Sequence, residues 1–326
     1  MPQNSAAYAA GRISMLRRDA LDSGRLERLM AASDLNEATR TLSEIGWSSA
    51  EGTDWEKLAD NKLLQASRTL RELSTDPELT DCYLLRYDVA NLKMLLKARC
   101  LNQRADSLSE CGTIPVEKLR HAVSEHSYQD LPMHLRSAMN QLEKEIAVSV
   151  DPMMIDVRLD HALYAGIFEM LKHHPKEKSS QDYFNGKADQ ANLMTVLRLI
   201  RMGKDTMLLQ RVLLPYGTVN ASAWTQAFAE PERLPELLRR YGAAVVAATR
   251  EAVASFAYAP KLEKAMDNAL LRLFAPYQYE PMRKETLLTY WIGTEREVAA
   301  VRLIMAGIAN GFSQEAIRER LRDLYG

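Results

Sequence analysis

The chain is short of the residues that make turns and cross-links. Its 14 glycines and 12 prolines amount to about 8% of 326 residues, whereas an average protein contains about 12%. Few turn-forming residues imply few turns and therefore long regular elements. The three cysteines, Cys82, Cys100 and Cys111, are too few for a disulfide framework. We expect them to serve as small apolar side chains, as cysteines of intracellular proteins do.

A long hydrophobic run is also missing. The most apolar stretch, residues 241–259, is interrupted by Arg250 and Glu251, and a membrane-spanning helix needs about 20 mostly apolar residues. No secretory signal pattern is visible, because residues 1–10 are polar and alanine-rich and arginines follow them. We therefore expect a soluble, cytoplasmic protein whose association with any membrane is peripheral.

The charge is almost balanced, with 42 basic and 43 acidic residues and a net charge of −1. A dedicated nucleic-acid-binding protein carries a basic excess, and a polybasic anchor for a lipid surface does too. We therefore predict no nucleic-acid partner and no direct lipid insertion.

Helical periodicity runs through the sequence, and the two-residue alternation of β-strands is nearly absent. Three apolar stripes have helical spacing: Leu85, Val89, Leu92 and Leu96; Leu193, Val196, Leu197 and Ile200; Val298, Val301, Ile304 and Met305. Thr53 or Asp54 is suited to cap the helix that follows, and Ser313 is suited to cap the last helix. The pattern predicts an all-α fold of about fifteen or more helices, at about 11–12 residues each.

Internal repeats are the most informative feature. The segments 56–64 (EKLADNKLL) and 263–271 (EKAMDNALL) are identical at six of nine positions, and 156–164 (DVRLDHALY) keeps the acid, Asp and Leu of both. A second marker recurs at 87–98, 188–199 and 296–307, and a third relates 111–119 to 216–224, with a weaker echo at 310–317. We predict three helical repeats, 1–110, 111–215 and 216–326; a cyclic shift of this frame fits equally well. A unit of this length is too long for the usual helical solenoid repeats.

Five polar residues in the second marker are candidate site residues. Asp88, Asp189 and Glu297 lie on or beside the apolar stripes, and Asn91 and Asn192 follow the two aspartates. A carboxylate in that position must be paired, hydrogen-bonded or turned toward a polar cavity. We favour a structural role between helices, and the functional alternative is that the acids face a shared opening where a partner binds.

Catalytic and metal-binding patterns find little support. His173 and His174 are adjacent, so on a helix their side chains diverge, and no Cys or His lies at ligand spacing from them. The sequence has neither a phosphate-binding loop nor a nucleophile motif of the G-x-S-x-G type. We therefore expect no catalytic residue, no cofactor and no metal. An enzyme that uses the repeated acids remains a distant hypothesis.

The repeated segments 84–99 (LLRYDVANLKMLLKAR), 189–203 (DQANLMTVLRLIRMG) and 295–321 (EREVAAVRLIMAGIANGFSQEAIRERL) resemble the C subunit of the V-type/A-type ATP synthase, called the d subunit in the eukaryotic vacuolar proton pump. The opening segment 8–21 (YAAGRISMLRRDAL) is similar to the start of that family as well. In the third copy Ala300 replaces the Asn, and that copy is truncated after Gly311.

The resemblance implies a funnel of three similar helical domains around a central opening. It implies a non-catalytic central-stalk subunit, peripheral to the membrane through its complex, with no cofactor. Its partners would be the central axle subunits and the membrane rotor ring, and its role a socket that couples ATP-driven rotation to proton or sodium transport. A helical scaffold of a soluble assembly is the alternative that the residues leave open.

Overall fold

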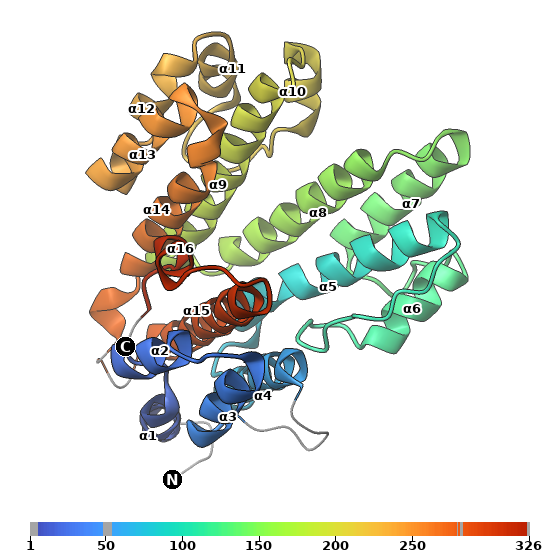
Figure 1. Cartoon of the computed structure of the whole chain (residues 1–326). Helices are drawn as coiled ribbons and strands as arrows, with labels where there is room; N and C mark the ends of the chain where they lie inside the picture. Colours follow the sequence, from blue (N-terminus) through green and yellow to red (C-terminus); the bar gives the residue numbers. More distant parts are fainter. Residues whose placement is uncertain (1–5, 48–53, 279, 281–282, 325–326) are drawn as a thin grey trace. The chain divides into compact units, whose positions relative to one another are not determined.

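The computed structural model describes residues 6–47, 54–278, 280 and 283–324. Every regular element within them is helical, with sixteen α-helices and five short 3-10 helices (Figure 1). This confirms the all-α prediction. By packing, the chain divides into two compact units: unit 1 consists of Met1–Pro77 with Leu238–Gly326, and unit 2 is Glu78–Leu237.

Unit 1 combines the two ends of the chain. Its helices are α1 (Ala6–Leu16), η1 (Arg17–Asp19), α2 (Ser23–Met30), α3 (Leu35–Glu44), α4 (Trp55–Leu73), η3 (Arg239–Tyr241), α13 (Ala243–Ala254), η4 (Phe256–Tyr258), α14 (Ala259–Arg272), η5 (Ala275–Tyr277), α15 (Lys284–Ala309) and α16 (Gln314–Arg320).

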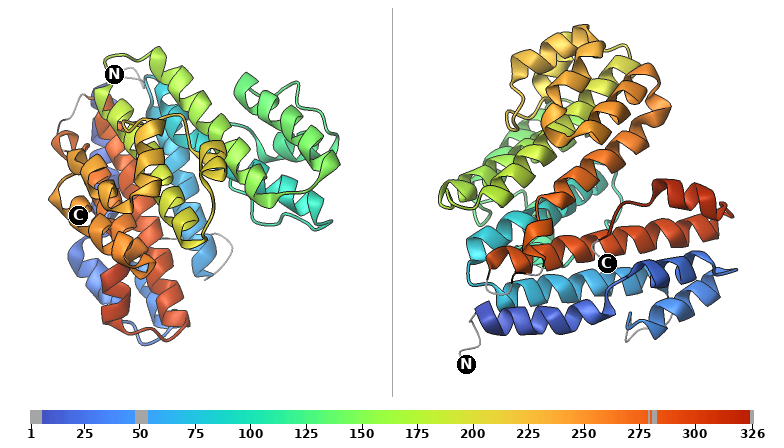
Figure 2. Two further views of the ribbon diagram at one scale, coloured as in Figure 1. Left: turned by 90° about the horizontal axis from the view of Figure 1, so that it is seen from above. Right: turned by 90° about the vertical axis from the view of Figure 1, so that its left-hand side faces the viewer.

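The long helix α15 organises unit 1. It packs along α4 and also contacts α1, α2 and α3, and Figure 2 shows α15 and α4 running side by side. Trp291 and Val301 of α15 and Leu70 of α4 are completely buried between these helices and their neighbours. The C-terminal part of unit 1 is thereby fixed to its N-terminal helices by apolar burial, the main favourable term in folding.

Unit 2 consists of the middle of the chain. Its helices are α5 (Pro77–Cys100), α6 (Val116–Ser124), α7 (Met133–Val148), α8 (Pro152–Lys172), α9 (Lys178–Arg201), α10 (Thr206–Val212), α11 (Ala221–Ala229), η2 (Pro231–Arg233) and α12 (Leu234–Leu237). The helices α7 and α8 form an antiparallel pair, and α9 contacts α8, α10 and α11.

The predicted stripes and caps largely agree with the structure. The stripes of α5 and α15 are buried throughout, whereas in α9 the last member, Ile200, is partly exposed and Leu199 is buried instead. Asp54 caps α4 by accepting from the Glu56 amide, and Ser313 caps α16. The alternative cap, Thr53, lies outside the described residues.

Two further expectations concern the chain as a whole. Among the helices of the described ranges, none has the length and apolar character that crossing a bilayer requires. The repeats 1–110, 111–215 and 216–326 divide the chain by sequence pattern, whereas the two units divide it by packing. The repeat boundaries and the funnel therefore remain predictions.

Candidate functional site

Asp88 anchors a loop to the middle of α5. Its side chain is completely buried. The carboxylate accepts hydrogen bonds from the Thr113 amide at 2.8 Å, the Thr113 hydroxyl at 2.7 Å and the Ile114 amide at 3.0 Å. Because Pro115, the N-cap of α6, has no side-chain acceptor, Asp88 satisfies amides just before that helix begins.

Asp189 repeats this arrangement on α9. It is also completely buried, and its carboxylate accepts from the Thr218 amide at 3.0 Å, the Thr218 hydroxyl at 2.6 Å and the Val219 amide at 3.3 Å. The anchored segment immediately precedes α11. The two aspartates, each in the second marker, therefore bind the third marker of the sequence through the same set of atoms.

The glycine of each anchored segment allows this close approach. A Cβ atom added to Gly112 would lie 2.8 Å from Cγ of Asp88, and one added to Gly217 would lie 3.0 Å from Cγ of Asp189. Gly217 also has a φ of +106°, in the region that favours glycine. The Gly-Thr pair of the third marker thus has a physical reason: Gly admits the carboxylate and Thr donates two hydrogen bonds to it.

Asn91 and Asn192 secure the same loops one turn further along. The Asn91 side chain donates to the Ser109 carbonyl and accepts from the Ser109 amide, both at 2.8 Å. Asn192 makes the equivalent pair with Leu214, at 3.0 and 2.8 Å. Each Asn side chain therefore forms two hydrogen bonds with the backbone of one loop residue, as a neighbouring β-strand would. Four of the five candidate residues thus bind loops within unit 2.

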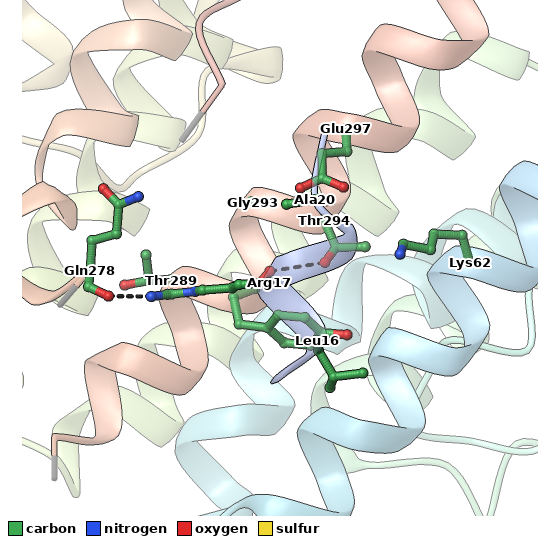
Figure 3. Close-up of a pocket in the computed structure, with 10 residues that line it drawn as sticks. Leu16, Arg17, Ala20, Lys62, Gln278, Thr289, Gly293, Thr294 and Glu297 are labelled. Carbon is green, nitrogen blue, oxygen red and sulfur yellow. Dashed lines mark hydrogen bonds between the residues drawn. The ribbon is translucent and has the colours of Figure 1, made fainter. Parts of the chain in front are cut away.

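Glu297 is different from the two aspartates. It lies on α15 in unit 1, is only partly buried, and forms part of the wall of a cavity of about 220 Å³. Arg17, Lys62, Thr289, Tyr290 and Thr294 also line this cavity. Figure 3 shows Lys62 extending from α4 toward Thr294 on α15.

The partner of Glu297 comes from the N-terminal segment. The Leu21 backbone acts on the Glu297 carboxylate and favours its ionised form, which lowers its pKa. Leu21 directly precedes Asp22, the N-cap of α2, just as Ile114 and Val219 precede the N-caps of α6 and α11. The weak echo at 310–317 does not take this place: in the described structure a Cβ built on Gly311 meets no carboxylate and no other atom within 4 Å beyond its own chain neighbours.

The environment of Glu297 favours the protonated form of its carboxyl group. Burial raises the pKa of the Glu297 carboxyl to about 7, against the opposing effects of the positive charge on Lys62, the Leu21 backbone and Arg25. A carboxyl with this pKa exchanges a proton near neutral pH. The expectation that all three acids face one shared opening remains a prediction.

Helix-to-helix ion pairs also follow the repeats, and the sequence patterns did not indicate them. Nζ of Lys93, five residues after Asp88, lies 2.6 Å from Oδ1 of Asp160. Arg302, five residues after Glu297, pairs with Asp60. Asp60 and Asp160 occupy matched positions of the first marker, so two copies place a cation at the same site.

The histidines that drew attention in the sequence have a local role. His173 Nδ1 and His174 Nε2 lie 2.8 and 3.1 Å from the two carboxylate oxygens of Glu78. These contacts hold the pKa of Glu78 below its usual value. Across the part of the chain that the structure describes, no group of three or more His, Cys, Asp or Glu side chains is arranged to hold a metal ion.

The comparison with known families shows to which family the chain belongs. The model of the ATP synthase (C/AC39) subunit family matches residues 9–320. This chain belongs to that family. It is the family of the C subunit of V/A-type ATPases, as the sequence resemblance indicated.

Three relatives are between 20% and 25% identical to this chain. The C subunit of the A-type ATP synthase of Thermococcus gammatolerans is 25% identical over 243 residues, which cover 72% of this chain and 65% of the relative. That of Thermococcus kodakarensis is 20% identical over 307 residues, 91% of this chain and 82% of the relative. The C subunit of the V-type sodium ATPase of Enterococcus hirae is 24% identical over 268 residues, 78% of each. In the first match the chain thus covers just under two thirds of the relative's length.

Proposed function

We propose that this chain is the non-catalytic central-stalk subunit of a rotary V/A-type ATPase. In this role it is a socket on the cytoplasmic face of the membrane, where it couples the central axle to the rotor ring. The observation that carries the proposal is the family match over residues 9–320. The names of the relatives, subunits of an A-type ATP synthase and of a V-type sodium ATPase, support ion transport by the whole complex, and we take the ion to be a proton or sodium.

The physical requirement of such a socket is stiffness, because torque must pass through it without unwinding the helices. The anchored loops meet this requirement in unit 2. Asp88 and Asn91 fix one loop to α5, and Asp189 and Asn192 fix another to α9. Displacing a buried carboxylate that accepts three hydrogen bonds costs a large free energy, because its donors lose their acceptor. These loops therefore resist shear between helices.

The repeated contacts support the three-repeat funnel within this proposal. Lys93 of α5 pairs with Asp160 of α8, and Arg302 of α15 pairs with Asp60 of α4. In the predicted frame these pairs join repeat 1 to repeat 2 and repeat 3 to repeat 1, a relation that a cyclic arrangement produces. The axle end would enter the opening between the repeats.

The interfaces should be modest in area. A socket meets the axle and the ring at separate ends, so each joint belongs to the smaller, reversible class of protein interfaces. Nucleic acid and the lipid itself are not expected partners, in line with the balanced charge of the chain.

The proposal is tested by binding experiments with purified components. The chain is incubated with the axle subunits, with detergent-solubilised rotor ring, and with the catalytic head lacking its axle, and the complexes are weighed by native mass spectrometry. We expect one copy on the axle, one copy on the ring and none on the axle-free head. Binding to the axle-free head alone would contradict the socket.

A further inference from the structure

A cavity of about 330 Å³ lies between α8 and α9 in unit 2. Its volume is at the lower end of the range of pockets that take ligands, about 300–1,000 Å³, so it has room for a few side chains but not for a whole helix. Most of its wall is apolar, and the side chains are Met153 and Val157 of α8, Leu199 of α9, Met202 just after α9, Val212 at the end of α10, and Leu214. The cavity is therefore suited to apolar groups.

The walls of this cavity are tied to neighbouring elements. Lys93 of α5 pairs with Asp160 of α8, and both hydrogen bonds of the Asn192 side chain hold the Leu214 backbone against α9. The helices α8 and α9 themselves contact each other over only a short part of their lengths, and Figure 1 shows them diverging. The space between them is therefore preformed, and an apolar space of this kind gains free energy when apolar side chains fill it.

The charged groups at the cavity leave one cation without a counter-ion. Asp156 and Asp160 line the cavity, but each pairs with a lysine of α5, Lys97 and Lys93 respectively. Arg198 of α9 also lines it and is exposed, and among the described residues no carboxylate pairs with its guanidinium. A carboxylate brought by a partner would therefore meet a cation that the chain itself does not neutralise.

His161 of α8 adds a second polar group to the wall. Its Nε2 atom is buried and, within the part of the chain that the structure describes, has no hydrogen-bond partner. Burial lowers the pKa of the ring, and the backbone of Val212 and Leu213 only partly opposes this effect, so the imidazole is neutral at pH 7. A neutral imidazole still carries one N–H, and in the tautomer protonated at Nε2 it donates to a carboxylate in the cavity.

Exposed methionines lie at the edge of the cavity. Met153 and Met202 are exposed although they line it, and Met207 on α10 is exposed as well. Lys204, in the loop between α9 and α10, is also exposed. Exposed apolar side chains that gather beside a cavity are typical of interaction sites, and methionine adapts its shape to different partners. The edge of the cavity thus combines apolar contact surface with positive charge.

We propose that the cavity between α8 and α9 is a docking site for a helix of a partner protein that is apolar on one side and acidic beside it. A few apolar side chains of that helix fill the cavity, and an acidic side chain pairs with Arg198 and accepts a hydrogen bond from His161. The inference is independent of the proposed function, because it concerns only the chemistry of one surface of unit 2.

The charges and the shape of the cavity favour this occupant over others. A lipid surface needs apolar side chains that protrude into the bilayer, whereas here most of the apolar wall is recessed. A small inorganic anion would pair with Arg198 but leave the apolar wall uncovered. A basic helix would place its charge next to Arg198 and Lys204, and like charges at an interface are unfavourable. An acidic amphipathic helix satisfies the apolar wall, Arg198 and His161 together.

A pair of matched peptides tests the site. Both are amphipathic helices of about 18 residues with leucines at helical spacing; one has glutamates beside the leucines, and the other has lysines at the same positions. Each carries a fluorescent label at one end and is titrated with the full chain, and fluorescence anisotropy reports binding. We expect the glutamate peptide to bind about 10-fold more tightly than the lysine peptide, and this difference should shrink as salt is added.

Variants at exposed positions assign the binding to the cavity. Arg198→Glu reverses the charge at the cavity, so it should weaken binding of the glutamate peptide by about 10-fold and strengthen binding of the lysine peptide. Met202→Ser removes apolar contact but no charge, so it should weaken binding of both peptides by the same factor. Lys118→Glu makes the same change of charge at an exposed lysine on α6, and as the control it should leave both affinities unchanged.

Hydrogen exchange of the complex locates the glutamate peptide, and we expect slower exchange of residues 153–164 and 191–202. The site is refuted if both peptides bind equally, if neither binds at about 1 mM of the chain, if Arg198→Glu leaves the preference unchanged, or if the protected amides lie elsewhere. Two further results would overturn the proposal by assigning the surface to another occupant. These are anionic lipid vesicles that bind the unaltered chain but not Arg198→Glu, and a dimer in native mass spectrometry that Arg198→Glu dissociates.

Discussion

The Lys93 ammonium lies 2.6 Å from the Asp160 carboxylate and joins α5 to α8. The Arg302–Asp60 pair joins α15 to α4 in the same way. Lys93 and Arg302 each follow an acid of the second marker by five residues. Asp160 and Asp60 occupy the same position of the first marker. The repeats visible in the sequence thus correspond to repeated contacts in space.

A double-mutant cycle measures the strength of this link. We expect Lys93→Met and Asp160→Asn to show a coupling energy of about 0.5–1 kcal/mol in urea unfolding, because the Lys93 side chain is only 22% exposed. The pair Lys172–Glu169, with side chains 69% and 64% exposed, is the matched control and should couple more weakly. Equal coupling in both pairs would mean that burial adds nothing to the Lys93–Asp160 contact.

Removal of an anchoring carboxylate should destabilise unit 2 severely. Asp88→Ala leaves the Thr113 and Ile114 amides without their acceptor, and we expect a loss of about 3 kcal/mol. Thr113→Val, which removes only the hydroxyl donor, should cost about 1 kcal/mol. Asp106→Ala is the control, since that side chain is 77% exposed and should change stability by less than about 0.5 kcal/mol. Denaturant unfolding followed by circular dichroism ranks the three variants, and a harmless Asp88→Ala would contradict the anchor.

A pair of glycine substitutions separates backbone strain from close approach. Gly217 and Gly242 have φ values of +106° and +99°, so alanine at either position costs about 1–3 kcal/mol through strain. Only at Gly217 does the new Cβ also press against the Asp189 carboxylate; within the described residues, a Cβ at Gly242 meets nothing within 4 Å. Thermal unfolding should therefore show a larger loss for Gly217→Ala. Similar losses would indicate that the carboxylate moves aside freely.

The raised pKa of Glu297 predicts how stability depends on pH. Between about 4.5 and 7 the folded chain holds a proton that the unfolded chain has released. The contribution of Glu297 to stability is therefore greatest at low pH, falls through this window and is constant above it. Glu297→Gln should gain stability relative to the unaltered chain as the pH rises from 5 to 8, by an amount on the order of 2 kcal/mol. Melting temperatures across that range provide the measurement, and a constant difference between the two proteins would contradict the assigned pKa.

Much of the fold was predictable because helical patterns are local. The all-α class, the buried stripes of α5 and α15 and the caps Asp54 and Ser313 follow from residues within a few turns of one another. The same logic identified Asp88 and Asp189 as unusual, since each lies on an apolar stripe. That their carboxylates bind the Gly-Thr segments was not predicted, although both features were recognised as repeated markers.

Sequence patterns could not predict which segment of the chain lies against Glu297. The N-terminal segment shares with the other two anchored segments only an aliphatic residue followed by a helix cap, Leu21 and Asp22. It has Asp19 and Ala20 where the others have Gly and Thr. It also lies at the opposite end of the chain from Glu297, so only the packing of α2 on α15 reveals the contact.

The central proposal is that this chain couples rotation to ion transport and performs no chemistry itself. Its most direct test is reconstitution of the complete ATPase in vesicles with and without the chain, with ATP hydrolysis and ion uptake recorded together. The account predicts that hydrolysis by the catalytic head persists without the chain while ion uptake disappears, and that adding the chain back restores uptake. Unchanged ion uptake in its absence, or ATP hydrolysis by the isolated chain, would contradict the account.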